Sequence, residues 1–294
     1  MEHFLWTENS KARNKLTEKY EPIQPYLFLN FLEFAGSDVV LDVGANVGFY
    51  SLIATMAQSV HSIYAFEPDE EAYQQLEKNL RLNGVEKMAK ALKTAVSQYE
   101  GTVQFATHSP MSGVNSVLST SIHDRNLFVE SNDVQAIKLD QIENIRGKTL
   151  GIKLDVEGHE LQVIEGASEL LKENPSVIQV EHYLGSGIDR KLYELGYFCF
   201  FAAGHDHYFT NIRNFTNPLF VRRAVEAAST WLVETQSGRR PNNRTIQDSL
   251  SLSCHTTGGN INAKAALKEK NFFSDDVEYA FYLIVDGEKS CEQW

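Results

Sequence analysis

Residues 41–51 read LDVGANVGFYS and follow the apolar pair VV (39–40), so a short apolar run ends in a glycine-rich bend. Such a β-branched run is typical of a buried parallel strand, and apolar residues then recur at helical spacing. This strand–bend–helix pattern predicts an α/β fold that holds a cofactor over the bend. The spacing of Gly44, Asn46 and Gly48 helps to decide which cofactor the bend can bind.

From residue 39 to about residue 203, strand-like and helix-like segments alternate, which indicates a mainly parallel sheet covered by helices. Asp69 is expected to cap one of these helices, and Asn83-Gly84 is expected to end it. We expect TVQFATH (102–108) to form an added hairpin arm and residues 109–133 to form a long functional loop. Strands of the main sheet are expected at residues 39–43, 62–68, 93–97, 151–156, 176–183 and 197–203.

Both ends of the chain depart from this alternation. Residues 1–36 are expected to be helical and to cap the site as a lid, with a plain packing helix as the alternative. Residues 37–222 are expected to form the α/β domain, and residues 223–294 an extension of unknown role. Around the extension we expect a helix at 221–235, a polar linker at 237–245 and a strand at 279–285.

The composition limits the partners and the compartment. A net charge of -12 over 294 residues repels phosphate backbones and anionic headgroups, which disfavours nucleic acid and membrane surfaces. The three cysteines, Cys199, Cys254 and Cys291, are far apart and suit a reducing compartment. Neither a signal peptide nor an apolar run of about 20 residues is apparent. We therefore expect a soluble, cytoplasmic protein without membrane insertion, and the sequence leaves its oligomeric state open.

The bend does not fit a dinucleotide site. After the first glycine, such a site needs a second glycine so that the pyrophosphate can approach the backbone, and a third so that helix and strand can pack closely. Counted from Gly44, these two positions hold Asn46 and Phe49. A tight turn at Gly44 with helix-start amides can instead hold a carboxylate. Asp42 is placed to bind an ammonium group, and Glu67, at the end of the next strand, can accept hydrogen bonds from both ribose hydroxyls. An ammonium, a carboxylate and a ribose without a diphosphate describe S-adenosyl-L-methionine.

Five motifs follow one another along the chain: LDVGANVGFYSLIA (41–54), AFEPDEEAYQQLEKNLRLNG (65–84), NSVLS (115–119), IKLDVEGHELQVIEGA (152–167) and IQVEHY (178–183). With these motifs the sequence resembles the FkbM family of S-adenosylmethionine-dependent O-methyltransferases. The resemblance covers roughly residues 20–200 and implies a Rossmann-like class I methyltransferase fold. This fold would have a mainly parallel seven-stranded sheet with helices on both faces, and the chain would add the N-terminal helical segment and the C-terminal extension. The methyltransferase domain would be residues 37–222.

The same resemblance implies roles for individual residues. Glu67 would hold the ribose and Val96 would flank the adenine. Asp155, at the end of the fourth strand, would face the methionine amino group or the substrate. The carboxyl edge of an open α/β sheet is where ligands bind, so the physical argument points to the same place. The methionine part would be held by Asp42, Gly44, Asn46 and Gly48.

A sugar or alcohol hydroxyl is a poor nucleophile near neutral pH, so methyl transfer to it is expected to need a general base or a metal. Our candidate catalytic residues are Asp155, His159 and His182, which follow the fourth and fifth strands. A carboxylate beside the two histidines, such as Glu157, is the alternative base. Histidine titrates nearest neutral pH, which favours the two imidazoles as bases. Glu157 and Glu160 open a helix, where the helix dipole alone favours carboxylates, and Glu160 is expected to be structural.

We expect no metal site. His205 and His207 would share a face if they lay on a strand, and both could bind one ion, but a polar loop after the sixth strand explains this run as well. The sequence favours an S-adenosylmethionine-dependent O-methyltransferase acting on a hydroxyl of a small molecule or glycan. A nicotinamide-dependent oxidoreductase and a non-catalytic partner protein that keeps the fold are the alternatives.

Overall fold

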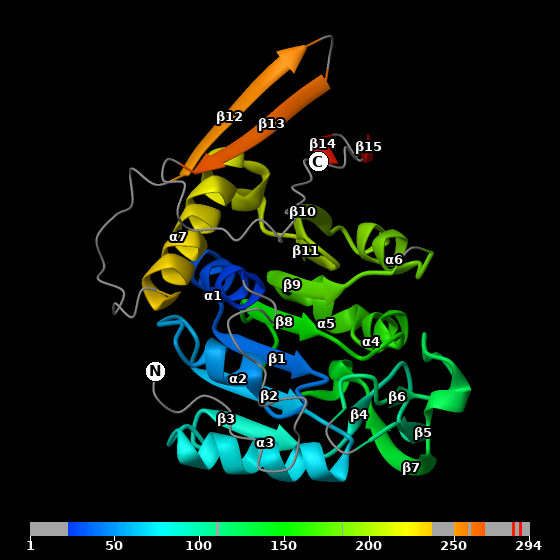
Figure 1. Ribbon diagram of the computed structural model, residues 1–294. Coiled ribbons are helices and arrows are strands. Elements are labelled where there is room, and N and C mark those ends of the chain that lie inside the picture. Colours follow the sequence, from blue (N-terminus) through cyan, green and yellow to red (C-terminus); the bar gives the residue numbers. More distant parts are fainter. Residues whose placement is uncertain are drawn as a thin grey trace.

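A seven-stranded sheet forms the centre of the protein in a computed structural model (Figure 1). The strand order is β10-β11-β9-β8-β1-β2-β3; β11 is antiparallel to both of its neighbours, and all other pairs are parallel. This arrangement confirms the expected Rossmann-like, mainly parallel fold. Its strands are β1 (Val39–Val43), β2 (Ser62–Phe66), β3 (Ala89–Leu92), β8 (Leu150–Leu154), β9 (Ser176–Glu181), β10 (Phe198–Ala203) and β11 (Asp206–Thr210). The structure describes residues 23–109, 112–183, 185–236, 250–257, 260–267, 284–285 and 288–289.

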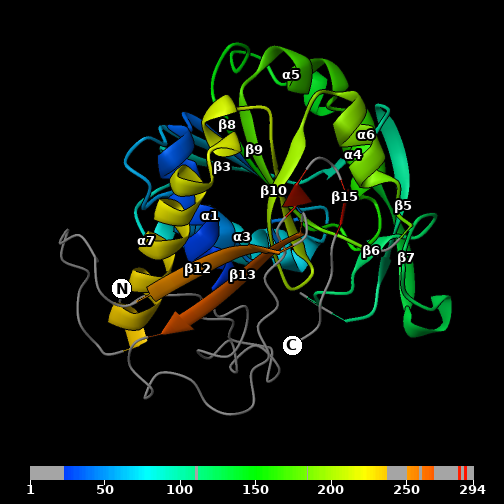
Figure 2. The same ribbon diagram turned by 90° about the horizontal axis from the view of Figure 1, so that it is seen from above.

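Helices cover both faces of this sheet (Figure 2). On one face Val40 packs with α1 (Gln24–Ala35), α2 (Phe49–Ala54) and α3 (Glu70–Leu82). On the other face Leu41 packs with α4 (Glu160–Glu165), α5 (Ser168–Glu173) and α6 (Ile188–Glu194). Successive side chains of a strand point to opposite faces, so the apolar run of β1 supplies both cores.

Helix α3 begins and ends where the sequence predicts. The Asp69 side chain accepts a hydrogen bond from the Ala72 amide at 2.8 Å, as an N-cap residue does. Asn83 is the C-cap, and Gly84 has a φ of +67°. This left-handed conformation favours glycine and ends the helix.

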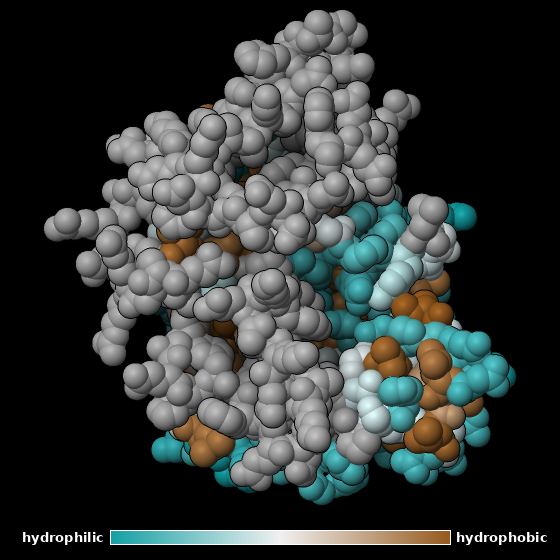
Figure 3. All heavy atoms as spheres, viewed as in Figure 1, coloured by the Kyte–Doolittle hydropathy of each residue, from teal (hydrophilic) through white to brown (hydrophobic). Residues whose placement is uncertain are grey.

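A second, four-stranded sheet lies beyond the carboxyl end of β3, in the order β4-β7-β5-β6. The prediction that residues 93–97 form the third strand of the main sheet is wrong, because β3 ends at Leu92. The Thr94 hydroxyl donates to the Gln135 carbonyl at 2.9 Å, and this bond joins the chain to the small sheet. The expected loop at 109–133 includes β6 and the start of β7. The strands are β4 (Ala95–Val96), β5 (Gly101–Thr107), β6 (Ser116–Val117) and β7 (Glu130–Ile137). Exposed hydrophobic residues gather over this sheet in Figure 3 and include Ile122, Leu127 and Val129.

The described part of the N-terminal segment is a core helix. Leu27 and Phe31 of α1 are fully buried between the sheet and α7 (Pro218–Gln236), and Phe28 is fully buried in the core cluster that includes β1 and α2. Pro25 lies in the first turn of α1, where proline is tolerated. Residues 24–35 therefore follow the packing-helix alternative, whereas residues 1–22 of the expected lid lie outside the described residues.

Helix α7 confirms the helix expected at 221–235 and continues across the expected domain limit at residue 222. The expected linker at 237–245 lies outside the described residues, and only the last two residues of the strand expected at 279–285 are described. Within the described parts of the chain, no helix is long and apolar enough to cross a membrane. The remaining strands form two antiparallel pairs, β12 (Leu250–Thr257) with β13 (Asn260–Leu267) and β14 (Ile284–Val285) with β15 (Glu288–Lys289).

The interpretation of the stretch after the sixth strand as a polar loop is wrong, because residues Asp206–Thr210 form β11. All five residues of β11 are buried, and the strand inserts between β9 and β10. The Asp206 carboxylate accepts a hydrogen bond from the Gln179 side-chain amide at 2.7 Å. A buried polar residue is tolerated when it is hydrogen-bonded, and this partner is distant in sequence.

Candidate functional site

A cavity of about 310 Å³ opens at the carboxyl ends of β1, β2 and β8. Strand order reverses at β1, and open α/β sheets bind ligands at such a switch point. The small sheet forms another wall through Phe105 and Val117. The predicted residues that line the cavity are Asp42, Gly44, Asn46, Glu67, Val96, Asp155 and His159.

Gly44 and Gly48 shape the bend in different ways. Gly44 has a φ of +81°, and a Cβ atom there would lie 1.8 Å from the backbone oxygen of Asp155. Only glycine lets the ends of β1 and β8 approach this closely. Gly48, by contrast, does not line the cavity. It is the N-cap of α2, and a Cβ atom there would lie 2.6 Å from Cδ1 of Leu76.

Asp42 is a buried carboxyl group at the cavity wall, with 2% of its surface exposed. Its Oδ2 atom accepts a hydrogen bond from the Ser51 hydroxyl at 2.6 Å. Burial raises the pKa of Asp42 to about 6, although the Ser51 hydroxyl and the Lys153 charge oppose this rise. A cationic ligand group beside Asp42 would stabilise its ionised form.

Glu67 follows β2 directly and is 5% exposed. The Asn46 amide donates to Oε2 at 2.7 Å, and the Asp69 amide donates to Oε1 at 2.8 Å. Asn46 adopts a φ of +50°, which non-glycine residues rarely do, although asparagine does so more often than most. The two amides come from different loops, so they fix the carboxylate where both loops meet the cavity.

Three carboxyl groups form an acidic cluster at the end of β8 and β9. Ligand oxygens of Asp155, Glu157 and Glu181 all lie within 4.8 Å of one another. Burial, followed by the charges of Asp155 and Glu181, raises the pKa of Glu157 to about 8. Burial and the Asp155 charge raise the pKa of Glu181 as well. Because like charges this close disfavour joint ionisation, the cluster retains protons near neutral pH.

His123 pairs with Glu157 from the long loop between β6 and β7. Its Nε2 atom lies 2.8 Å from Oε2 of Glu157. Burial lowers the pKa of His123, while burial and neighbouring charges raise that of Glu157, so both shifts favour the uncharged forms of the pair. Glu157 has a φ of +54°, and Gly158 follows with a φ of +109°. This unusual turn sets the position of the Glu157 side chain. The sequence analysis allowed a carboxylate beside His159 as the base, but it did not consider His123.

The two predicted histidine bases occupy different places. His159 lines the cavity, but its Nδ1 lies 2.7 Å from the Thr120 hydroxyl and its Nε2 lies 3.0 Å from the Ser97 hydroxyl. Burial lowers the pKa of His159 to about 4. His182 does not line the cavity; its Nε2 lies 3.1 Å from Oδ1 of Asp189 on α6. The structure therefore brings Asp155 and His159 to the cavity but leaves His182 outside it.

Lys153 is a buried cation beside these acids, and the sequence analysis did not single it out. Its side chain is 2% exposed, and its Nζ lies 3.5 Å from Oδ2 of Asp155 and 3.4 Å from Oδ1 of Asp206. The same Nζ lies 4.9 Å from the centre of the Tyr50 ring. Lys153 offsets part of the negative charge at this end of the cavity.

Together, the sheet order and the cavity define a Rossmann-like protein of the methyltransferase type. Residues 42–216 match the family described as Methyltransferase FkbM domain. This chain belongs to the FkbM methyltransferase family.

Individual relatives match a smaller part of the chain. Hexuronic acid methyltransferase AglP of Haloferax volcanii is 29% identical over 163 residues, which are 52% of this chain and 59% of that relative. Methyltransferase sdnD of Sordaria araneosa is 29% identical over 178 residues, which are 51% of this chain and 68% of that relative. The crystal structure of methyltransferase FkbM from Methylobacillus flagellatus KT is 17% identical and superposes with a TM-score of 0.41. The matched region covers 60% of this chain and 44% of the chain in that crystal structure.

Proposed function

We propose that this chain is an S-adenosylmethionine-dependent O-methyltransferase that acts on a sugar or another small hydroxyl compound. The observation that carries the proposal is one cavity that brings two sets of carboxyl groups together. Asp42 and Glu67, from β1 and the end of β2, line this cavity. Asp155 and Glu157 also line it, and they form an acidic cluster with Glu181. When bound, the cofactor supplies an electrophilic methyl group.

Asp42, Glu67 and their neighbours fit this cofactor. Asp42 would accept a hydrogen bond from the methionine ammonium group. Amides at the start of α2 would donate to the methionine carboxylate, because those of Gly44 and Ala45 already donate to the Phe66 carbonyl. Glu67 would hold the ribose hydroxyls, because its carboxylate is already fixed by two amides. Val96 and Phe105 offer apolar walls for the adenine. We propose these roles for Asp42, Gly44, Asn46, Glu67 and Val96.

Glu157 is the base that the geometry favours. A general base works best with a pKa near the operating pH, and burial and neighbouring charges raise that of Glu157 to about 8. His123 would position its carboxylate through the 2.8 Å contact. The ring nitrogens of His159 are both within hydrogen-bond distance of hydroxyls, and His182 lies outside the cavity lining, so we prefer Glu157 to either. Asp155 would face the cofactor or the acceptor from the end of β8.

The acidic cluster also bears on the acceptor. Carboxyl groups exchange hydrogen bonds with sugar hydroxyls, and the negative charge that the cluster keeps disfavours carboxylates and phosphates. The relative AglP is named for a hexuronic acid, which supports a sugar acceptor but differs in charge from the acceptor proposed for this chain. For this chain we propose a neutral polyhydroxy acceptor, either free or within a glycan. Nucleic acid would meet both this cluster and a net charge of -12, so we propose no nucleic-acid substrate.

The proposal is tested by incubating the full chain with methyl-labelled S-adenosylmethionine and a matched panel of acceptors. The panel contains neutral sugars, the corresponding uronic acids and a short RNA, and mass spectrometry locates the label. We expect label on an oxygen of a neutral sugar, more slowly on its uronic acid and not on RNA. Label on a nitrogen or on RNA would contradict the proposal. Binding of NAD without binding of S-adenosylmethionine would favour the oxidoreductase alternative.

A further inference from the structure

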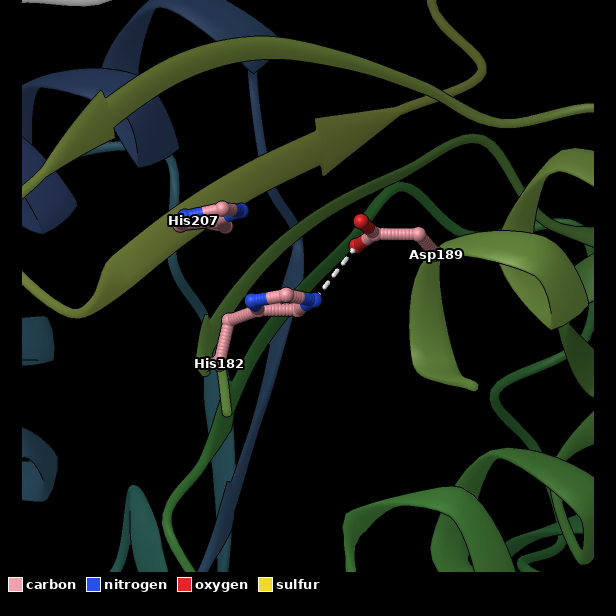
Figure 4. Close-up of side chains that lie close together, drawn as sticks. All are labelled: His182, Asp189 and His207. Carbon is pink, nitrogen blue, oxygen red and sulfur yellow. Dashed lines mark ion pairs between the residues drawn. The ribbon is translucent and has the colours of Figure 1, made fainter. Parts of the chain in front are cut away.

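Two histidines and an aspartate meet outside the cavity, where β9, β11 and α6 come together (Figure 4). Potential ligand atoms of His182, Asp189 and His207 all lie within 4.8 Å of one another. Nε2 of His182 lies 3.1 Å from Oδ1 of Asp189. The rings of His182 and His207 stack with centres 4.3 Å apart and planes 10° apart.

This cluster lies on the other side of the sheet from the carboxylate of Glu181. His207 pairs with Val180 across β11 and β9, and His182 is two residues beyond Val180, so both imidazoles belong to the same face. That face is covered by α6, since Val180 shares a core cluster with Ile188. Glu181 lies between the two positions, and its side chain points the opposite way. The cluster is therefore separate from the acidic cluster of Asp155, Glu157 and Glu181.

We propose that His182, Asp189 and His207 bind one zinc ion. Two imidazoles and one carboxylate are a ligand set that zinc accepts, with a fourth position left for water. Magnesium and calcium prefer sites made of oxygen ligands alone, which this cluster is not. His207 is 8% exposed and the Asp189 side chain is 38% exposed, so an ion can enter from the Asp189 side.

Binding requires a small local rearrangement. Bond lengths of about 2.0–2.2 Å place tetrahedral donors roughly 3.4 Å apart, so the groups must close by about an ångström from their widest separation. The two parallel rings must also tilt so that their nitrogens converge. His182 lies just beyond the end of β9, and Asp189 lies in the first turn of α6, so both can move without breaking the sheet. The ion would tie the segment after Glu181 to β11.

The sequence pattern points to a different pair. It places His205 with His207, but β11 begins at Asp206, so His205 precedes the strand. The His205 ring lies against Tyr183, with centres 6.5 Å apart. His205 is therefore a nearby control that the proposed site does not use, and the proposal departs from the sequence expectation of no metal.

Calorimetric titration of the chelator-treated full chain with zinc chloride tests the proposal. We expect one high-affinity ion per chain. His182→Ala and His207→Ala should each weaken binding by roughly 100-fold, and Asp189→Asn by roughly tenfold or more. His205→Ala should bind as the wild type does. The double variant Cys254→Ser/His255→Ala removes potential ligands beyond the described side chains and should also bind normally.

A second readout does not require that the histidine variants fold. X-ray absorption of the zinc-loaded wild-type chain should show two imidazole ligands. Zinc should raise the melting temperature of the wild type more than that of Asp189→Asn. Absence of a bound ion, fewer than two imidazoles, or loss of binding only in the Cys254/His255 control variant would overturn the proposal. The stacked pair would then be a packing contact.

Discussion

Replacing Glu157 with glutamine removes an ionisable group that the fold keeps protonated to unusually high pH. The side chain is 17% exposed and lies beside Asp155 and Glu181. Glutamine keeps the volume and puts a neutral amide in the place of the carboxyl group that faces His123. The change therefore isolates the charge of Glu157 from its packing.

The sign of the effect follows from the direction of the pKa shift. The pKa rises from 4.5 to about 8 on folding, so the folded state binds this proton more tightly. The resulting stabilisation is fully present below about pH 4.5 and is lost as pH rises through about 8. The whole shift corresponds to about 5 kcal/mol at 1.36 kcal/mol per unit. Because solvent screens a partly exposed group, we expect Glu157→Gln to be more stable than the wild type by roughly 1–3 kcal/mol at pH 9, and equally stable at pH 4.

Urea unfolding followed by tryptophan fluorescence at pH 4, 7 and 9 measures this difference. Glu165→Gln, at an exposed position on α4, is the matched control and should change stability little at any pH. If Glu157 is also the base, turnover of the wild type rises with pH through about 8, and Glu157→Gln loses roughly 10²–10⁴-fold in rate. A Glu157→Gln chain that gains no stability at pH 9 would refute the electrostatic reasoning. Unchanged turnover would refute the role as base.

Three further perturbations test other parts of the site. Gly44→Ala places a Cβ atom 1.8 Å from the Asp155 backbone oxygen. We therefore expect the free energy of unfolding to fall by roughly 3 kcal/mol or more in thermal unfolding, or the variant not to fold. A normal melting temperature would contradict the geometry of the bend. Lys153→Met leaves the buried carboxylate of Asp206 and the half-buried carboxylate of Asp155 without their cation, and it should cost roughly 3–5 kcal/mol in urea unfolding. The exposed control Lys172→Met should cost less than about 1 kcal/mol. Equal losses would argue against the buried network. The pKa of Asp42 is raised to about 6, so the affinity for S-adenosylmethionine should fall about tenfold per pH unit below 6 when it is measured by calorimetry. A constant affinity down to pH 5 would show that Asp42 does not bind the ammonium group.

The parts of the fold that could be predicted are those encoded by local pattern. The run before Gly44 is apolar on both faces, and Asp69 has the chemistry of an N-cap, so both were placed correctly. Strand β11 could not be placed, because Asp206 and His207 look like loop residues. Asp206 is buried only because Lys153 and Gln179 reach it from other strands.

The same distinction applies to the site. The lining residues from β1 and β2 follow from a glycine bend and from a carboxylate at a strand end, which are local signals. The pairing of His123 with Glu157 joins residues 34 positions apart. It depends on the positive φ of Glu157 and on the path of a long loop, neither of which the residue pattern reveals. His182 was placed near the site because it follows β9, but its side chain belongs to the other face of the sheet.

The identity of the cofactor is the central claim, and calorimetric titration of the full chain with S-adenosylhomocysteine, alongside NAD, tests it most directly. We predict one site for S-adenosylhomocysteine and no heat from NAD. Glu67→Ala should weaken that site by roughly 1.5–3 kcal/mol, because charged hydrogen bonds to the ribose are lost. Binding of NAD with no heat from S-adenosylhomocysteine, or an affinity for S-adenosylhomocysteine that is unchanged in Glu67→Ala, would contradict the assignment of this cavity.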